Sequence, residues 1–221
     1  MITLHHLNNS RSQRIIWLLE ELGVEYQIKR YERDPKTNLA PKALKELHPL
    51  GKSPVITDGD RTIAESGLII EYLVANYGDQ FQAETHSDLD WQIKYWLHYS
   101  EGSLMPLMVI RLLFDKIKSS PMPFFVKPIA KAIADKAMAA YAGPNIINNL
   151  KYIEQHLEGK EFFCGDKLTA ADFQMSFPLE AMVAKADMSQ SHPNIVAYVK
   201  RIHTRSAYQA GLEKGGDYDY A

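Results

Sequence analysis

The sequence predicts an α/β N-terminal half followed by an all-helical C-terminal half. Strand and helix patterns alternate over residues 1–78, whereas residues 88–221 carry helical patterns alone. The stretch 79–87 between them is polar and typical of a linker. We therefore expect two domains, 1–78 and 88–221, joined by this linker.

The chain opens with a strand, a helix and a second strand. Ile2–Leu7 is an apolar run, and residues 8–12 form a polar break rich in helix-capping side chains. Apolar residues then recur at helical spacing over Gln13–Leu22, and Gly23 ends that helix. Tyr26–Tyr31 alternates like a strand. This order predicts a parallel strand pair with a crossover helix.

The rest of the first half is a short helix, a hairpin and a longer helix. Pro41–Leu47 is the short helix, and the turn signal at residues 58–60, Asp-Gly-Asp, joins strand Pro54–Thr57 to strand Arg61–Ala64. Glu65 and Ser66 then open a helix with apolar positions on one side.

The hairpin and its flanks also suit the binding of a small charged, peptide-like ligand. Pro54 has no N–H and is of the kind often found cis at a tight bend, so the neighbouring backbone is left free to pair with an extended ligand. The start of the helix at Ser66 offers N–H groups and a hydroxyl to an anion. Glu65 beside it is suited to an ammonium group.

The C-terminal half is predicted to be a succession of helices. Residues 88–118 form a long helical pattern in which Pro106 predicts a kink, and residues 119–123 break it. Residues 124–142 are helical, and Gly143-Pro144 is expected to open a new helix over Asn145–Leu157. His192-Pro193-Asn194 starts a further helix, and Gly215–Ala221 is expected to be a mobile tail.

One helix start in this half is specified twice. Thr169 and Asp172 have the spacing of a capping box, with the acid in place of the usual glutamate. Leu168 and Phe173 occupy the positions of a hydrophobic staple. A helix whose start is defined in this way is expected to lie in the centre of its domain.

The composition limits the binding partners and the cellular compartment that are expected for this protein. The 221 residues carry a formal charge of −2, so neither nucleic acid nor an anionic membrane surface is indicated as a partner. No apolar run reaches the roughly 18 residues of a membrane span, and no secretory signal is visible. The single cysteine, Cys164, excludes an intrachain disulfide and is expected to be a packing residue. A cytoplasmic location fits these features.

Metal and nucleotide chemistry are not indicated. The eight histidines form no H-E-x-x-H motif, and the chain has no C-x-x-C pair. His5 and His6 are adjacent in a strand and therefore point to opposite faces. No glycine-rich phosphate loop is present. We expect no metal ion.

The binding segment resembles that of the glutathione transferases. The matching residues are Gly51-Lys52-Ser53-Pro54-Val55 and Glu65-Ser66-Gly67, and the capping motif at residues 169–172 also occurs in that family. The resemblance extends over almost the whole chain. It implies a thioredoxin-like N-terminal domain, glutathione as co-substrate, a small apolar electrophile as second substrate, and a homodimer.

The first turn of the chain resembles that of serine-type members of the family, which occur in bacteria and fungi. Their pattern is a serine followed four residues later by an arginine, here Ser10 and Arg14. The resemblance implies that Ser10 donates a hydrogen bond to the glutathione thiolate. Other members place the hydroxyl one position earlier, at Asn9, so Asn9 is the second candidate and Ser12 the third. With neither tyrosine nor cysteine in this turn, the tyrosine-type enzymes and thiol–disulfide exchange are disfavoured.

The remaining site residues follow from the same resemblance. Val55 would pair its backbone with the cysteinyl part of glutathione, Glu65 and Ser66 would hold the γ-glutamyl end, and Lys52 and His48 would reach the glycine carboxylate; Ser53 and Pro54 complete the turn. The electrophile is expected against the helical half, near Tyr99, Ser103, Met105, Met108 and Arg111.

The implied reaction is conjugation of glutathione thiolate to small electrophiles. Two alternatives remain at this stage. One is a glutathione-dependent peroxidase, because some serine-type members reduce organic peroxides. The other is a non-catalytic binding or scaffold protein with the same fold, although such proteins tend to lose the acid–hydroxyl pair or the proline turn that this chain keeps.

Overall fold

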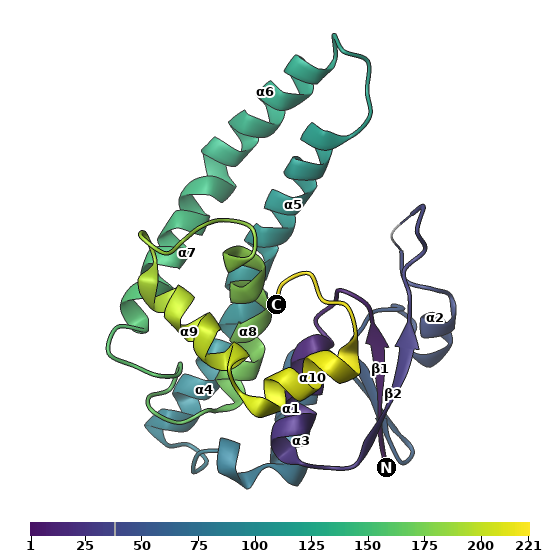
Figure 1. Ribbon diagram of the computed structural model, residues 1–221, viewed down its shortest axis with the longest axis vertical. Helices are drawn as coiled ribbons and strands as arrows, with labels where there is room; N and C mark the ends of the chain where they lie inside the picture. Colours follow the sequence, from purple (N-terminus) through teal and green to yellow (C-terminus); the bar gives the residue numbers. More distant parts are fainter. Residues whose placement is uncertain (38) are drawn as a thin grey trace.

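The structure is a computed structural model that describes residues 1–37 and 39–221. Its N-terminal half is a small sheet flanked by helices, and its C-terminal half consists of helices (Figure 1). The elements of the N-terminal half are β1 (Ile2–Leu7), α1 (Gln13–Leu22), β2 (Tyr26–Tyr31), α2 (Ala43–Leu47), β3 (Val55–Asp58), β4 (Arg61–Ala64) and α3 (Ser66–Tyr77). Those that follow are the short helix η1 (Asp79–Phe81), then α4 (Asp88–Tyr99), η2 (Ser100–Leu104), α5 (Met105–Ser119), α6 (Lys127–Ala137), η3 (Met138–Ala142), α7 (Gly143–His156), α8 (Ala170–Val183), α9 (Pro193–His203) and α10 (Ser206–Gly215).

The four strands have the order β2-β1-β3-β4. The two sequential strands β1 and β2 are parallel, as the strand–helix–strand start predicted, while β3 is antiparallel to β1 and to β4. Gly59 turns the β3–β4 hairpin with φ +57°, a left-handed conformation that glycine adopts without strain. The thioredoxin-like α/β fold of the N-terminal half is therefore confirmed.

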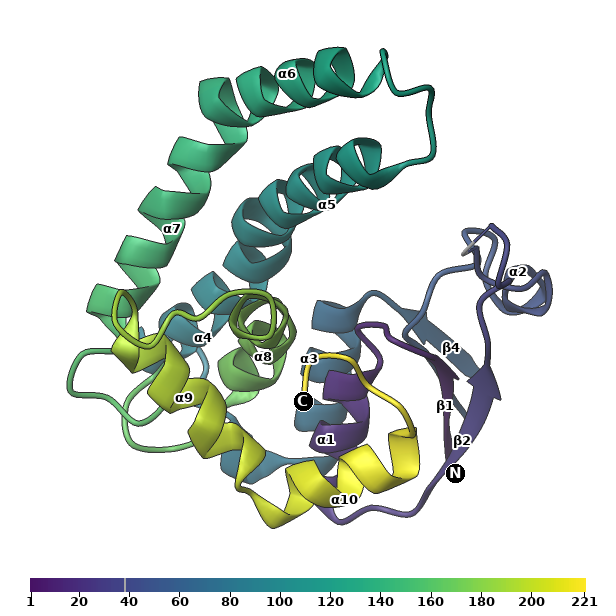
Figure 2. The same ribbon diagram turned by 45° about the horizontal axis from the view of Figure 1, so that its top comes forward.

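Helix α1 joins the two halves of the molecule. It is covered by α10 along its length, and α8 packs against it from the helical half (Figure 2). The Trp17 side chain on α1 contacts both of these helices. Its ring centroid lies 4.6 Å from that of Phe173 on α8 and 5.7 Å from that of Tyr208 on α10. The main hydrophobic core consequently runs without interruption from the sheet into the helical half.

The helical half contains a long hairpin made of α5 and α6, which extends away from the rest of the protein (Figure 1). In each arm a turn of π-helix precedes a proline by two residues: η2 before Pro106 and η3 before Pro144. A proline cannot donate to the carbonyl four residues earlier, and a π turn accommodates that lost bond. Helix α7 does begin at Gly143, as expected, although η3 leads into it from α6 without a break.

The predicted capping box is present at the start of α8. The Asp172 carboxylate accepts hydrogen bonds from the backbone N–H of Thr169 at 2.8 Å and from that of Phe163 at 2.9 Å. All residues of α8 from Ala170 to Met182 are buried. The start of this central helix is therefore capped by the side chains of Thr169 and Asp172, and we call such a capped start closed.

The described part of the chain contains no helix long and apolar enough to cross a membrane. Nor do its histidine, cysteine and acidic side chains gather, within these ranges, into a group of three or more suited to a metal ion.

Candidate active site

One end of the sheet gathers the three segments that the sequence analysis singled out. His5, Val55 and Ala64 are register partners across β1, β3 and β4. The loop containing Ser10 follows β1, Ser53 and Pro54 precede β3, and Glu65 and Ser66 follow β4. Because β3 is antiparallel to both neighbours, all three segments emerge at the same end of the sheet.

The turn before β3 has the geometry that its proline predicted. The Ser53–Pro54 peptide bond is cis. The Ser53 hydroxyl donates to the carbonyl of His5 at 2.9 Å and accepts from the N–H of Leu7 at 3.3 Å, so its side chain closes the end of β1. Among the described residues, the backbone groups of Ser53 make no hydrogen bond to other backbone groups. Val55, in contrast, has a strand on either side.

The start of α3 is left open. Glu65 has φ +74°, an unusual conformation for a residue with a side chain, and no side chain caps the helix. The Ser66 side chain is buried, whereas Glu65 is exposed. Lys52 is also exposed, and the half-buried His48 ends α2 with its buried Nδ1 atom unpartnered among the described residues. The first turn of α3 therefore offers free N–H groups next to a carboxylate.

The loop between β1 and α1 holds a chain of buried hydrogen bonds. The Ser10 hydroxyl lies 2.7 Å from the Ser12 hydroxyl, which lies 2.8 Å from Nδ1 of His6. The backbone N–H of Ser12 also donates to the Ser10 hydroxyl at 3.3 Å. Burial, with a smaller contribution from the charge of Arg30, lowers the pKa of His6 to about 4. His6 is therefore neutral at physiological pH, and the three hydrogen-bonded side chains of Ser10, Ser12 and His6 carry no net charge.

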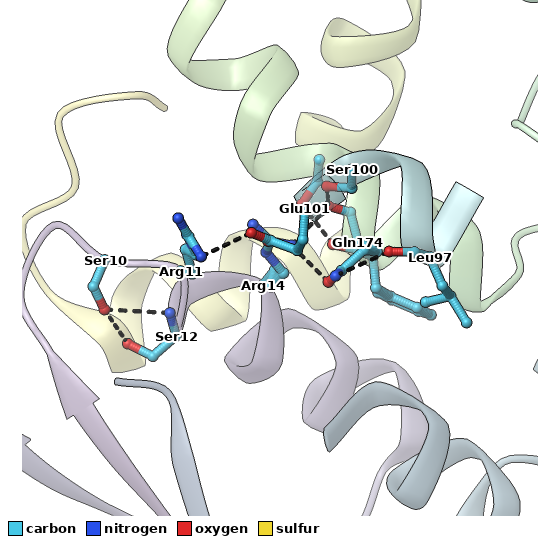
Figure 3. A network of polar contacts seen from close by, with 10 residues as sticks. Ser10, Arg11, Ser12, Arg14, Leu97, Ser100, Glu101 and Gln174 are labelled. Atoms are coloured by element: carbon cyan, nitrogen blue, oxygen red, sulfur yellow. Dashed lines mark hydrogen bonds and ion pairs between the residues drawn. The ribbon is translucent and has the colours of Figure 1, made fainter. Parts of the chain in front are cut away.

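The two arginines next to Ser10 are both engaged by the helical half (Figure 3). Arg11 pairs with Glu101 of η2 at 2.7 Å. Arg14 is fully buried and donates to the carbonyl of Gln174 at 2.8 Å, with Glu101 at 3.2 Å. Burial lowers the pKa of Arg14 to about 10 despite the opposing charge of Glu101, so the guanidinium stays charged. Arg14 therefore positions α1 against α8 and η2.

The last residues of the chain cover the same loop, contrary to the mobile tail that their composition suggested. The N–H of Asp219 donates to the side-chain oxygen of Asn9 at 3.0 Å. The Tyr218 hydroxyl donates to the buried carboxylate of Glu180 at 2.6 Å, and the Tyr220 ring lies 5.6 Å from that of Phe177. Asn9 itself has φ +47°. Its amide oxygen is occupied by the tail, which leaves its NH₂ group as the donor.

The residues expected around the electrophile are spread over different surroundings. Tyr99 packs in an aromatic cluster with Trp96 and Tyr152, and its hydroxyl donates to Asn149. Met105 is buried, while Ser103 is exposed on η2. Met108 and Arg111 line a hollow between α5, α7 and α8. Only the last two therefore share a concave surface.

The sequence analysis missed Glu101 and Gln174 as partners of the loop before α1, and Glu180 as a partner of the tail. No local signal identifies them, because Glu101 and Gln174 lie 87 and 160 positions from Arg14, and Glu180 lies 38 positions from Tyr218. The one available clue was Arg14, a charged residue on the apolar side of a helix, since a buried charge requires a partner.

Cys164 does not belong to the site. It is half-buried against the core that also contains Phe163 and Phe173. Burial raises the pKa of its thiol to about 12, which makes it a poor nucleophile at neutral pH. Its expected role in packing agrees with this position.

The fold and the site together define a class of protein: a thioredoxin-like domain that presents a cis-proline turn and an uncapped helix start, fused to a helical domain. Comparisons with known proteins place the chain within that class. Residues 1–75 match the glutathione S-transferase N-terminal domain, and residues 119–214 match the glutathione S-transferase C-terminal domain. The chain belongs to the glutathione S-transferase family.

Its relatives support the same assignment over nearly the whole chain. Glutathione S-transferase 3 of Schizosaccharomyces pombe is 39% identical, covering 98% of this chain and 89% of the relative. Glutathione S-transferase 1 of Saccharomyces cerevisiae is 36% identical, covering 97% and 95%. The crystal structure of a glutathione S-transferase from Actinobacillus pleuropneumoniae superimposes with a TM-score of 0.79 at 36% identity, covering 97% and 93%. The protein is a glutathione transferase, and glutathione is its co-substrate.

Proposed function

We propose that this transferase activates glutathione with the hydroxyl of Ser10, as a serine-type enzyme, and transfers the thiolate to a small apolar electrophile. The proposal rests mainly on the strand register, in which His5, Val55 and Ala64 are paired across β1, β3 and β4. This register supports a position for the Ser10 loop, the cis-proline turn and the start of α3 at one end of the sheet.

The chemistry requires a thiolate near neutral pH. A free thiol has a pKa of roughly 8.5, and lowering it by about 2 takes about 2.7 kcal/mol of selective stabilisation of the anion. One hydrogen bond to a charged group contributes roughly 1.5–3 kcal/mol. The Ser10 hydroxyl can supply most of this stabilisation, because it lies directly before α1 and the helix start adds N–H groups. Arg11 adds little net charge, since Glu101 neutralises it.

Asn9 is the second donor in this proposal. Because the tail occupies its amide oxygen, its NH₂ group remains available to the sulfur. Ser12 is the weakest candidate, since its hydroxyl is fully buried and engaged by His6 and Ser10.

The rest of glutathione is held as an extended peptide. Its cysteinyl backbone pairs with Ser53, whose backbone groups are free next to the cis bond, rather than with the enclosed Val55. Its γ-glutamyl carboxylate meets the open N–H groups of α3 and the Ser66 hydroxyl, and its ammonium group meets Glu65. Lys52 and His48, on the segment before the turn, are assigned to the glycine carboxylate.

The electrophile is placed between the Ser10 loop and the helical half. Met108 and Arg111 are its candidate residues in the helical half, where both line a small hollow between α5, α7 and α8. A flexible thioether suits apolar substrates of varied shape. The surroundings of Tyr99 give it a role in packing rather than in this pocket.

We also propose that the protein is a cytoplasmic homodimer. Exposed apolar side chains on α3 and α4, among them Leu68, Trp91 and Tyr95, offer a surface for a second copy of the chain. Sedimentation of the wild type and of Trp91→Glu tests the dimer, which the added charge is expected to dissociate. A wild type that sediments as a monomer would refute it.

The first experiment for the catalytic assignment is the ultraviolet absorbance of bound glutathione thiolate against pH. In the wild type the bound thiol is expected to titrate about 2 pH units below free glutathione, and in Ser10→Ala close to it. Equal titration of both complexes at low pH would assign the activation to Asn9 or to backbone amides.

A further inference from the structure

The tip of the α5–α6 hairpin, residues 116–134, exposes large apolar side chains that the fold does not use. Phe124 and Phe125 lie in the loop that joins the two helices and are 85% and 64% exposed. Their ring centroids are 5.6 Å apart, and neither ring belongs to a hydrophobic cluster of the described residues. Ile117 and Ile129, on either side of the loop, are exposed as well. Apolar side chains in such positions indicate a contact with another surface.

The tip protrudes from the rest of the molecule, at the end of the hairpin that points away from the sheet (Figure 1). Pro121 and Pro123 restrict the backbone of the joining loop, and the N–H of Val126 donates to the carbonyl of Pro123 at 2.9 Å. The two phenylalanine rings are therefore presented on a protruding turn with a restricted backbone. A deformable surface can take up such protruding rings without a matching cavity.

The tip is also the most basic part of the hairpin. Residues 105–142 carry six basic and two acidic side chains, a net charge of +4, so the rest of the chain carries −6. Within the tip itself there are four lysines and no acidic residue. Lys118 pairs with Asp135, just beyond the tip, at 2.6 Å. Three tip lysines make no ion pair with the described residues: Lys116, Lys127 and Lys131. The whole-chain charge of −2 therefore conceals a basic tip on an acidic body.

The lysines lie a short way behind the aromatic rings. Lys116 is three residues before the end of α5 at Ser119, Lys127 is the first residue of α6, and Lys131 follows four residues later. At a rise of about 1.5 Å per residue, all three lie within about 6 Å of the helix ends along the helix axes. Aromatic rings at the end with lysines behind them match the order of acyl chains and phosphates at a membrane surface.

A second copy of the chain is a poor occupant for this surface. A two-fold contact brings the same patch of both subunits together. At the tip it would place lysines against lysines, with no acidic side chain in the stretch to pair with them. The occupant must instead be negatively charged and able to accept apolar side chains.

We propose that the tip of the α5–α6 hairpin docks on an anionic phospholipid bilayer. The rings of Phe124 and Phe125 enter the interfacial region, and the lysines lie next to the lipid phosphates. The contact is peripheral and reversible. It brings the enzyme to a place where apolar electrophiles accumulate, because apolar molecules partition into lipid. The docking does not depend on which residue activates glutathione.

The test is co-sedimentation of the full-length protein with vesicles. We expect binding to vesicles of phosphatidylcholine with about 30% phosphatidylserine, and at least about tenfold weaker binding to phosphatidylcholine alone. Raising the NaCl concentration from about 0.1 to about 0.5 M should weaken the binding, because salt screens the lysines. A wild type that binds neither vesicle, or both equally, would overturn the proposal.

Two double variants separate the apolar and the charged contributions. Phe124→Ser/Phe125→Ser is expected to weaken binding to the anionic vesicles at least about tenfold, since it removes both inserted rings. Lys127→Gln/Lys131→Gln is expected to weaken it about 30-fold, from roughly a fivefold contribution of each lysine near an anionic surface. Wild-type binding by either variant would contradict the proposed geometry.

The matched control is Lys151→Gln/Lys200→Gln, which removes the same charge from exposed positions on α7 and α9. It is expected to bind within about twofold of the wild type, and a loss equal to that of the tip variant would refute a specific role for the tip. If Phe124→Ser/Phe125→Ser instead converts a dimer to a monomer in vesicle-free buffer, a second copy covers the tip and the proposal is wrong. Conjugation activity without vesicles should be unchanged in all three variants, so the assignment of Ser10 stands or falls separately.

Discussion

Two helix starts in this protein use hydroxyl side chains in opposite ways. At α8, Thr169 and Asp172 satisfy the free N–H groups of the helix start with their own side chains. At α1, Ser12 is the capping residue but makes no side-chain cap, and its hydroxyl joins Ser10 and His6 instead. The closed start stabilises the fold, whereas the open start keeps hydroxyls and N–H groups available for a ligand.

Helix α3 follows the second pattern, because it begins without a side-chain cap at a residue with positive φ. Most of the other described helix starts also lack a side-chain cap, so what distinguishes α3 is that its open start lies at the end of the sheet beside the cis-proline turn. The comparison predicts that substitutions at the start of α8 lower stability and spare glutathione binding, and that substitutions of Ser10 and Glu65 at the two open starts mainly affect glutathione. His6, which is buried behind the start of α1, is expected to affect stability below pH 6.5.

The largest effect is expected at the closed start. Asp172→Ala removes the capping acid and leaves the N–H groups of Phe163 and Thr169 without their acceptor. We expect a loss of about 4 kcal/mol in the free energy of unfolding, measured with urea. Asp166→Ala, an exposed acid nearby, is the control and is expected to change it by less than about 0.5 kcal/mol. Equal losses in both variants would contradict a specific role for the cap.

The second effect is the pH dependence of stability at the open start. The pKa of His6 is about 4 in the folded protein against 6.5 for an unperturbed histidine, so the unfolded chain binds more protons between these values. The contribution of His6 to the free energy of unfolding is fully present above pH 6.5. About 3 kcal/mol of it is lost as the pH falls towards 4. Unfolding of His6→Asn across this range is expected to show a shallower slope than the wild type. The exposed His98→Asn should retain the wild-type slope, and a wild-type slope in His6→Asn would refute the prediction.

The third effect is catalytic. Ser10→Ala is expected to lower kcat/KM about 100-fold at neutral pH, because it removes one hydrogen bond to a developing anion. Its free energy of unfolding should fall by only about 1 kcal/mol. A variant that loses stability and activity in proportion would show that Ser10 acts as a structural residue, like Thr169.

The smallest effect concerns binding at α3. Glu65→Gln is expected to raise KM for glutathione about tenfold with little change in kcat, since the ammonium group of the ligand does not take part in the reaction. Glu71→Gln, an exposed acid further along the same helix, provides the matched control. A change in kcat without a change in KM would remove Glu65 from the binding site.

The sequence predicted those features that short stretches of chain specify. The cis-proline turn, the β3–β4 hairpin and the capping box each involve residues within a few positions of one another, so their signals are local. The π turn that leads into α7 at Gly143 was not predicted, because a π turn has no simple sequence signal.

The order of the elements, the two kinds of helix start and the candidate residues at one end of the sheet can all be read from the sequence, because backbone restrictions and periodicity act over a few residues. The groups that those residues contact depend on the packing of the whole chain. Arg14 reaches Gln174, Ser12 reaches His6 across a turn, and the tail reaches Asn9. Most of these partners lie far apart in the chain, and the preference of buried polar groups for a hydrogen bond selects them only once packing has brought them together.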